Sequence, residues 1–135
     1  MGTLLARASA RNPEMVTLSA AQAGNGVSTN IAERGPSHKG GAVRIVTAAG
    51  ATPTCTYLIE VSVDGSVWTA ATWADVSTPT VDSTATFVIT TTGVTTKIVK
   101  QPAFWRFIRV TYSANTNVVN TVDFLYDDSQ TPPWF

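Results

Sequence analysis

The segment CTYLIEVSVDGSVW, residues 55–68, determines the fold class of this chain of 135 residues. Apolar side chains occupy every odd position from Cys55 to Val63, and Thr, Leu, Glu and Ser alternate with them. Alternation with a period of two is typical of a strand that buries one face. The pair Asp64-Gly65 follows and favours a tight hairpin, because glycine tolerates positive φ and Asp caps the turn. We therefore predict that the chain reverses here into a second strand, which carries Val67 or Trp68 inward.

The rest of the sequence has the same character, with many Thr and Val residues, whose β-branched side chains pack well on a sheet. Turn residues recur at short intervals, as in sandwiches and barrels. The predicted strands span residues 15–19, 42–48, 55–63, 66–72, 84–91, 95–100, 104–114 and 118–126, with an edge strand or ordered loop at 27–32. We expect 104–114 and 118–126 to pair as a hairpin around Asn115–Asn117, and GATPT at 50–54 to be a turn.

No predicted helix could cover a sheet face, so two sheets must cover each other. The sequence therefore predicts an all-β fold: an antiparallel β-sandwich, jelly-roll-like, with seven to nine strands. We divide the chain into an extended N-terminal arm (1–14), a β-sandwich domain (15–128) and a C-terminal tail (129–135). Prolines in the tail forbid sheet pairing. Because two large aromatic side chains are costly to leave in water, Trp134-Phe135 either folds back onto its own domain or anchors in a neighbouring subunit, with a disordered tail as the third alternative.

Composition argues against several classes of function. Nine basic side chains balance nine acidic ones, which disfavours electrostatic capture of nucleic acid. Only 13% of the residues are charged, a surface common in proteins that pack against others. No segment approaches the ~20 apolar residues of a membrane helix, and the N-terminus does not resemble a secretory signal. The single cysteine, Cys55, cannot form an internal disulfide and is expected to be a buried, inert thiol.

The sequence predicts no enzyme, no cofactor and no metal. His38 is the only histidine, and no nucleophile motif surrounds it. A zinc site needs several His or Cys ligands. Asp127-Asp128 could bind Ca²⁺, but a solvated strand end explains the pair more simply. Glu60 and Asp123 could face each other as a carboxylate pair for glycoside hydrolysis, yet each is expected to be an outward-facing charge.

The tryptophans distinguish a sugar-binding protein from a structural one. Trp68 and Trp73 are five positions apart, so a continuous strand places them on opposite faces, one of them in the core. Trp105 stands between aromatic neighbours in FWRF and is expected to pack inside the sandwich. A sugar platform requires exposed coplanar aromatic rings with polar groups around them. The sequence offers no such cluster and favours core packing.

Two resemblances accompany these patterns. Val63–Ser66, Trp68 and Arg106–Val110 resemble one end of discoidin-like carbohydrate-binding jelly rolls, where these positions are mostly structural. The cysteine pair and the ligand loops of that family have no counterpart here. A larger part, GATPTCTYLIEVSVDGSVW followed by QPAFWRFIRVTYSANT, resembles small virion proteins of tailed bacteriophages.

The second resemblance implies a non-enzymatic β-sandwich on the virion that decorates or cements the capsid, often as a homotrimer. Its partners would be the major capsid protein and copies of itself. The arm and the tail lie outside the shared pattern, so we expect Arg7, Arg11, Trp134 and Phe135 to make subunit or capsid contacts. A carbohydrate-binding module that touches a host glycan, and a tail or neck subunit, are the alternatives.

Overall fold

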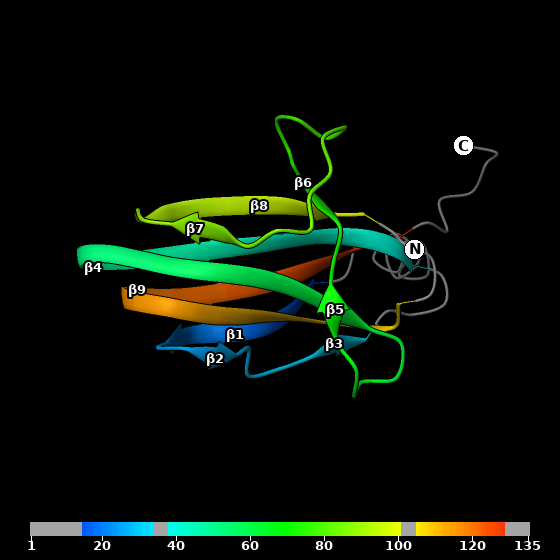
Figure 1. The fold of residues 1–135 in the computed structure, drawn as a ribbon, viewed down its shortest axis with the longest axis horizontal. Helices are drawn as coiled ribbons and strands as arrows, with labels where there is room; N and C mark the ends of the chain where they lie inside the picture. Colours follow the sequence, from blue (N-terminus) through cyan, green and yellow to red (C-terminus); the bar gives the residue numbers. More distant parts are fainter. Residues whose placement is uncertain (1–14, 34–37, 101–104, 129–135) are drawn as a thin grey trace, which may run out of the picture.

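The computed structural model describes residues 15–33, 38–100 and 105–128, and the regular secondary structure of this part of the chain is entirely β. The predicted fold class is confirmed. Nine strands lie within the described residues (Figure 1): β1 (Met15–Ala23), β2 (Gly26–Val27), β3 (Ala32–Glu33), β4 (His38–Ser62), β5 (Thr69–Ala70), β6 (Trp73–Asp75), β7 (Phe87–Ile89), β8 (Gly93–Val99) and β9 (Phe107–Asp128).

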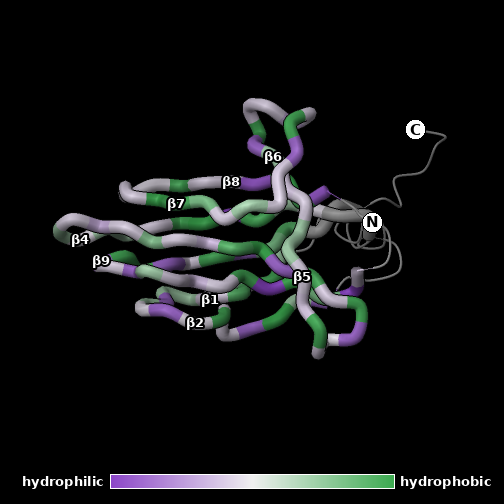
Figure 2. Tube along the Cα trace, viewed as in Figure 1, coloured by the Kyte–Doolittle hydropathy of each residue, from purple (hydrophilic) through white to green (hydrophobic). Residues whose placement is uncertain are grey.

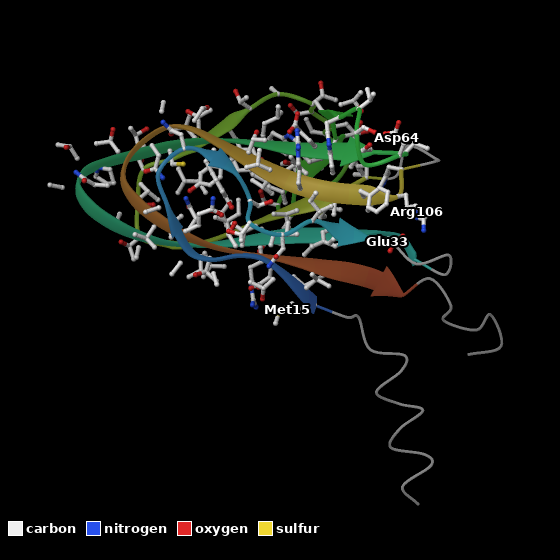
Figure 3. All side chains as sticks on the ribbon, turned by 90° about the horizontal axis from the view of Figure 1, so that it is seen from below. Met15, Glu33, Asp64 and Arg106 are labelled. Carbon is white, nitrogen blue, oxygen red and sulfur yellow. The ribbon has the colours of Figure 1, made fainter. Side chains whose placement is uncertain are left out.

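Two very long strands, β4 and β9, organise the fold. The first half of β4 pairs with the second half of β9, from Gly41↔Tyr126 to Ala49↔Val118. The second half of β4 pairs with the first half of β9, from Thr54↔Thr116 to Ser62↔Phe107. Both strands bend at the same end of the molecule (Figure 1). The paired ribbon therefore folds over into two layers, which Figure 3 shows from the side.

The bends are made by residues in left-handed backbone conformation. Thr52 has φ of 42°, and Ala114 and Asn117 have φ of 49° and 55°. Such residues break the ladder locally and turn the strand, as β-bulges do. The predicted hairpin between 104–114 and 118–126 is therefore wrong, as is the separation of 42–48 from 55–63. Residues 42–48 and 55–62 belong to one bent strand, β4, and residues 107–114 and 118–126 belong to another, β9. Each half of β4 pairs with a half of β9.

The remaining strands complete a jelly roll. β1 pairs with the second half of β9, β2 and β3 with its first half, β8 with the first half of β4, and β5 and β7 with its second half. The early and late parts of the chain are thus paired in nested order, which is the jelly-roll arrangement. Because β4 and β9 run through both layers, the nine strands form one continuous hydrogen-bonded sheet, and we call its two layers the first and the second sheet. The first sheet has the order β1-β9-β4-β8-β6. The second sheet has β2 and β3, then β9, β4, and finally β5 and β7.

Alternating side chains of both sheets meet in one core, and hydropathy alternates along the strands accordingly (Figure 2). Cys55, Tyr57 and Ile59 are fully buried as predicted. Val63 is 66% exposed, contrary to the prediction, because β4 ends at Ser62. The tryptophan predictions are confirmed, since Trp73 and Trp105 are both buried.

Polar groups inside the core are paired. The Tyr57 hydroxyl donates to Oδ1 of Asn120, and the hydroxyls of Tyr112 and Ser19 share a hydrogen bond of 2.6 Å. Burial raises the pKa of Tyr57, and it raises the pKa of Tyr112 to about 12. The Cys55 thiol is buried as predicted, and desolvation raises its pKa. These groups stay neutral at ordinary pH and hold the two sheets in one register.

The turn after β4 is confirmed, but the returning strand is short. Gly65 has φ of 81°, and Oδ1 of Asp64 accepts hydrogen bonds from the backbone N–H groups of Ser66 and Val67. Only Thr69–Ala70 then pairs with β4. Val67 is 68% exposed, which excludes it as the inward residue of this segment.

Lys97 faces inward at the edge of the core, at a position where a strand usually carries an apolar residue. It is opposite the buried Val43 in the β4–β8 ladder. Its ammonium group bonds the Asp75 carboxylate and lies 4.4 Å from the ring centre of Trp73 and 4.7 Å from that of Phe87. Cation–π contact and ion pairing compensate for its burial. The lysine thereby joins β8 to β6 and β7.

Candidate docking surface

The outer face of the first sheet is more apolar than an exposed sheet face usually is. Register places its outward side chains in four rows across the strands. The rows are Ile98–Ala42–Leu125–Met15, then Thr96–Arg44–Asp123–Thr17, then Val94–Val46–Thr121, and finally Ala48–Val119–Ala23. Three of the four rows are thus mainly aliphatic. We call this surface the first-sheet face.

One ion pair lies in the middle of the first-sheet face. Arg44 donates to Oδ2 of Asp123 at 2.8 Å, and the Thr17 hydroxyl donates to Oδ1 at 3.0 Å. The Asp123 residue is only 4% exposed although it points outward, because its neighbours close over it. The charges of this pair cancel. The face therefore presents aliphatic surface without net charge.

The most exposed part of the face is a valine patch, made of Val46, Val94 and Val119. Val46 is directly opposite Val94 in the ladder and diagonal to Val119. Val94 is 65% exposed, and the other two are each 37% exposed. Contiguous aliphatic side chains in water mark interaction surfaces more often than scattered ones do. The patch lies toward the bent end of the sandwich.

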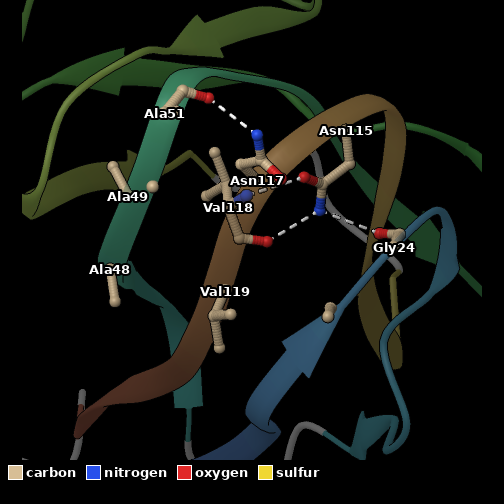
Figure 4. Close-up of a pocket in the computed structure, with 10 residues that line it drawn as sticks. Gly24, Ala48, Ala49, Ala51, Asn115, Asn117, Val118 and Val119 are labelled. Atoms are coloured by element: carbon tan, nitrogen blue, oxygen red, sulfur yellow. Dashed lines mark hydrogen bonds between the residues drawn. The ribbon is translucent and has the colours of Figure 1, made fainter.

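A shallow groove continues the valine patch around the bent end (Figure 4). We call it the bend groove. Its walls are Ala48–Ala51 of β4, Ala23 at the end of β1 with Gly24 after it, and residues of the β9 bend, Asn115 and Asn117–Val119. The Asn117 amide donates to the carbonyl of Ala51 at 2.7 Å, and the Asn115 amide donates to the carbonyls of Gly24 and Val118, both at 3.0 Å. These bonds fix the walls.

The outer face of the second sheet is built differently. Its central ion pair joins Arg109 to Glu60 at 3.0 Å. The Trp68 ring covers the guanidinium of Arg109 at 4.1 Å from the ring centre. Trp68 is thus half-buried against its own sheet. Among the described residues, the large hydrophobic side chains that are exposed are all aliphatic, so this part of the chain shows no exposed aromatic platform.

The residues that the sequence predicts to make subunit or capsid contacts lie outside the part of the chain that the structure describes. Arg7 and Arg11 of the arm, and Trp134 and Phe135 of the tail, lie outside the described residues. The backbones of His38 and Asp127-Asp128 belong to β4 and β9, but their side chains also lie outside the described part. The contact prediction therefore stays a prediction.

The Glu60–Asp123 carboxylate pair, which the sequence left open as an alternative, does not form, and the expected outward-facing charges are found instead. Glu60 is opposite Arg109 in the second sheet, and Asp123 is opposite Arg44 in the first sheet. Both point outward on opposite faces of the sandwich, as expected for charges with a structural role. Within residues 15–33, 38–100 and 105–128 no three His, Cys, Asp or Glu side chains cluster in a way that could hold a metal ion. No helix in the same ranges is long and apolar enough to span a membrane.

Comparison with known proteins gives a fold but no family. No protein-family model matches the sequence, and no curated protein matches it. Among solved structures, the crystal structure of the SPBc2 prophage-derived protein YomS is similar to this chain, with a TM-score of 0.59 at 9% identity. The match covers 86% of this chain and 94% of the YomS chain. At this identity the likeness shows that the two proteins share a fold.

Sequence reasoning did not identify the valine patch or the bend groove. A signal was present: AVRIVTA and VVNTVDFL carry apolar residues at positions of both parities, so these strands cannot hide all of them on one face. The sequence carries no comparable signal for the bend groove. The groove forms where the bend of β4 meets the bend of β9, and these bends lie far apart in the sequence.

Proposed function

We propose that this protein is a non-enzymatic structural component of a bacteriophage particle, which decorates or cements the capsid by docking on neighbouring capsid subunits. The single observation that carries the proposal is the aliphatic face of the first sheet, over which no described element folds, on a jelly-roll scaffold whose solved neighbour is prophage-derived. Its partners are the major capsid protein and copies of itself, as a homotrimer, and its location is the virion surface. No nucleic acid, membrane or cofactor takes part.

Charge supports an aliphatic, uncharged docking partner. The Arg44–Asp123 pair is already neutralised within the face, and the whole chain has zero formal net charge. A partner with a strong charge of either sign would gain little there and would lose hydration. A capsid surface of matching aliphatic character would bury the valine patch and gain about 25 cal/mol for each Å² removed from water.

Reconstitution tests the proposal. The purified protein is added to capsids that lack it, and binding is followed by co-sedimentation and by electron cryo-microscopy of the particles. We expect saturable binding at regular surface sites and greater resistance of the decorated particles to heat. Absence of binding to capsids contradicts the proposal. A sixfold ring bound to tails or necks, or specific glycan binding without capsid binding, would replace it with one of the alternatives.

A further inference from the structure

The bend groove has room for large side chains of another molecule. Its volume is about 740 Å³, and its walls are methyl groups, backbone and the sides of two asparagines. Val118 at its floor is only 2% exposed, so the core beneath the groove is already packed. The groove is therefore a hollow of the surface and not a gap in the core. Short aliphatic walls of this kind leave space that aromatic rings fill well, and aromatic side chains bury the most area per residue at interfaces.

The sequence supplies two suitable side chains in Trp134 and Phe135. They follow Pro132-Pro133, which cannot donate hydrogen bonds to a sheet edge. This segment is therefore suited to insert side chains into a groove rather than to add a strand. Large aromatic pairs are costly to leave in water.

The tail cannot reach the bend groove of its own chain. Val119, the groove residue of β9 nearest to Asp128, precedes it by nine residues, a span of about 30 Å at the rise of an antiparallel strand. Phe135, the more distant of the two, follows Asp128 by seven residues, so its Cα lies within about 25 Å of that of Asp128 even when fully extended. A reversal of direction shortens this reach further. Figure 1 shows the bends and the end of β9 at opposite ends of the sandwich.

We propose that Trp134 and Phe135 of one copy occupy the bend groove of a second copy. The contact joins one end of the sandwich to the opposite end of its neighbour, so it is heterologous and closes into a ring when the rotation between neighbours permits. A homotrimer is the closed form that fits the proposed function. The inference rests on the self-association in that proposal, but it does not require capsid binding.

Two variants of the full chain test the contact by native mass spectrometry. The tail variant carries Trp134→Ala and Phe135→Ala, and the groove variant carries Ala48→Glu on an exposed wall residue. The matched control is Ala85→Glu, at an exposed position away from the groove. We expect the parent and the control to form the same closed oligomer, and both variants to be monomers with unfolding midpoints close to that of the parent.

Mixing the two defective variants gives the sharpest outcome. The groove variant keeps an intact tail, and the tail variant keeps an intact groove, so one contact forms and the assembly stops. We expect a one-to-one heterodimer and no larger species. A monomeric parent, variants that still assemble, or a mixture without heterodimer would each overturn the inference.

A peptide experiment keeps the inference testable if the groove variant fails to fold. A synthetic peptide of residues 128–135 is titrated into the tail variant while backbone amide signals are followed by NMR. We expect shifts confined to residues 23–24, 48–51 and 115–119, and none with a peptide carrying Trp134→Ala. Shifts elsewhere, or none, would overturn the inference. Capsid binding is measured separately, so self-association fails or holds independently of the function proposed above.

Discussion

Each outer face of the sandwich has an ion pair at its centre, but the surroundings of the two ion pairs differ. Each has an arginine on one ribbon strand bonded to a carboxylate on the other: Arg44–Asp123 on the first sheet and Arg109–Glu60 on the second. The loop after β4 bends back and lays Trp68 over Arg109. No described element covers Arg44, and the valine patch lies next to it. Within the described part of the chain, a loop covers the ion pair of the second face and none lies over that of the first, which is why we propose the first as the contact surface.

The largest expected effect separates the two faces in the particle-binding assay. Val46→Asp places an unpaired charge in the valine patch, and we expect capsid affinity to fall about 100-fold, or about 2.7 kcal/mol. The control is Val88→Asp, at a residue of the second sheet that is 56% exposed. It should leave affinity unchanged. Equal losses in both variants would remove the distinction between the faces.

The ion pairs should differ in their contribution to stability. Asp123 is nearly inaccessible and accepts bonds from Arg44 and Thr17, so Asp123→Ala should lower the free energy of unfolding by about 2–3 kcal/mol. Glu60 bonds one arginine near the surface, and Glu60→Ala should cost about 1 kcal/mol. Urea titrations measure both values. A larger loss of stability for Glu60→Ala than for Asp123→Ala would show that burial does not determine which ion pair contributes more.

Removal of the tryptophan cover tests whether it belongs to the fold rather than to a binding site. Trp68→Ala should lower the free energy of unfolding by about 1 kcal/mol, because it removes the cation–π contact with Arg109. Capsid affinity should not change. If Trp68→Ala weakened capsid binding while the unfolding midpoint stayed constant, the second face would be a contact surface too.

The loop that carries Trp68 should add the smallest effect, a dependence of stability on pH. Backbone N–H groups of Val67 and Ser66 hold the pKa of Asp64 at about 2 in the folded protein, below the roughly 3.9 of an unperturbed aspartate. The ionised Asp64 therefore makes its full contribution to the free energy of unfolding above about pH 4. This contribution disappears as the pH falls through 2. The unfolding midpoints of the parent and of Asp64→Asn should converge over this interval. Curves that stay parallel would contradict the assignment.

The parts of the fold that the sequence predicts are those fixed by local physics. The alternation from Cys55 to Val61 predicts a half-buried strand, and Asp64-Gly65 predicts the turn, because both depend on neighbouring residues. The bent strands escape prediction. A turn sequence such as GATPT can reverse a chain into a hairpin or bend one strand between two sheets, and only long-range pairing with β9 decides between them.

The candidate surface is predictable only in part. Low charge and the apolar residues on both faces of β4 and β9 indicate a packed surface, but its uncovered state depends on where the loops fold. Trp68 and Val46 illustrate this limit. Both are large apolar residues near an arginine, and only the path of the loop after β4 decides which face is covered.

Thiol accessibility on the assembled particle tests the docking face most directly. Val94→Cys and Val88→Cys place single reporters on the first and second sheet faces, at positions that are 65% and 56% exposed. The native Cys55 is fully buried and gives a low background. Both reporters should react with a maleimide in the free protein. On decorated capsids the cysteine at 94 should be protected and the one at 88 should remain reactive; protection at 88 with free reaction at 94 would contradict docking through the first sheet.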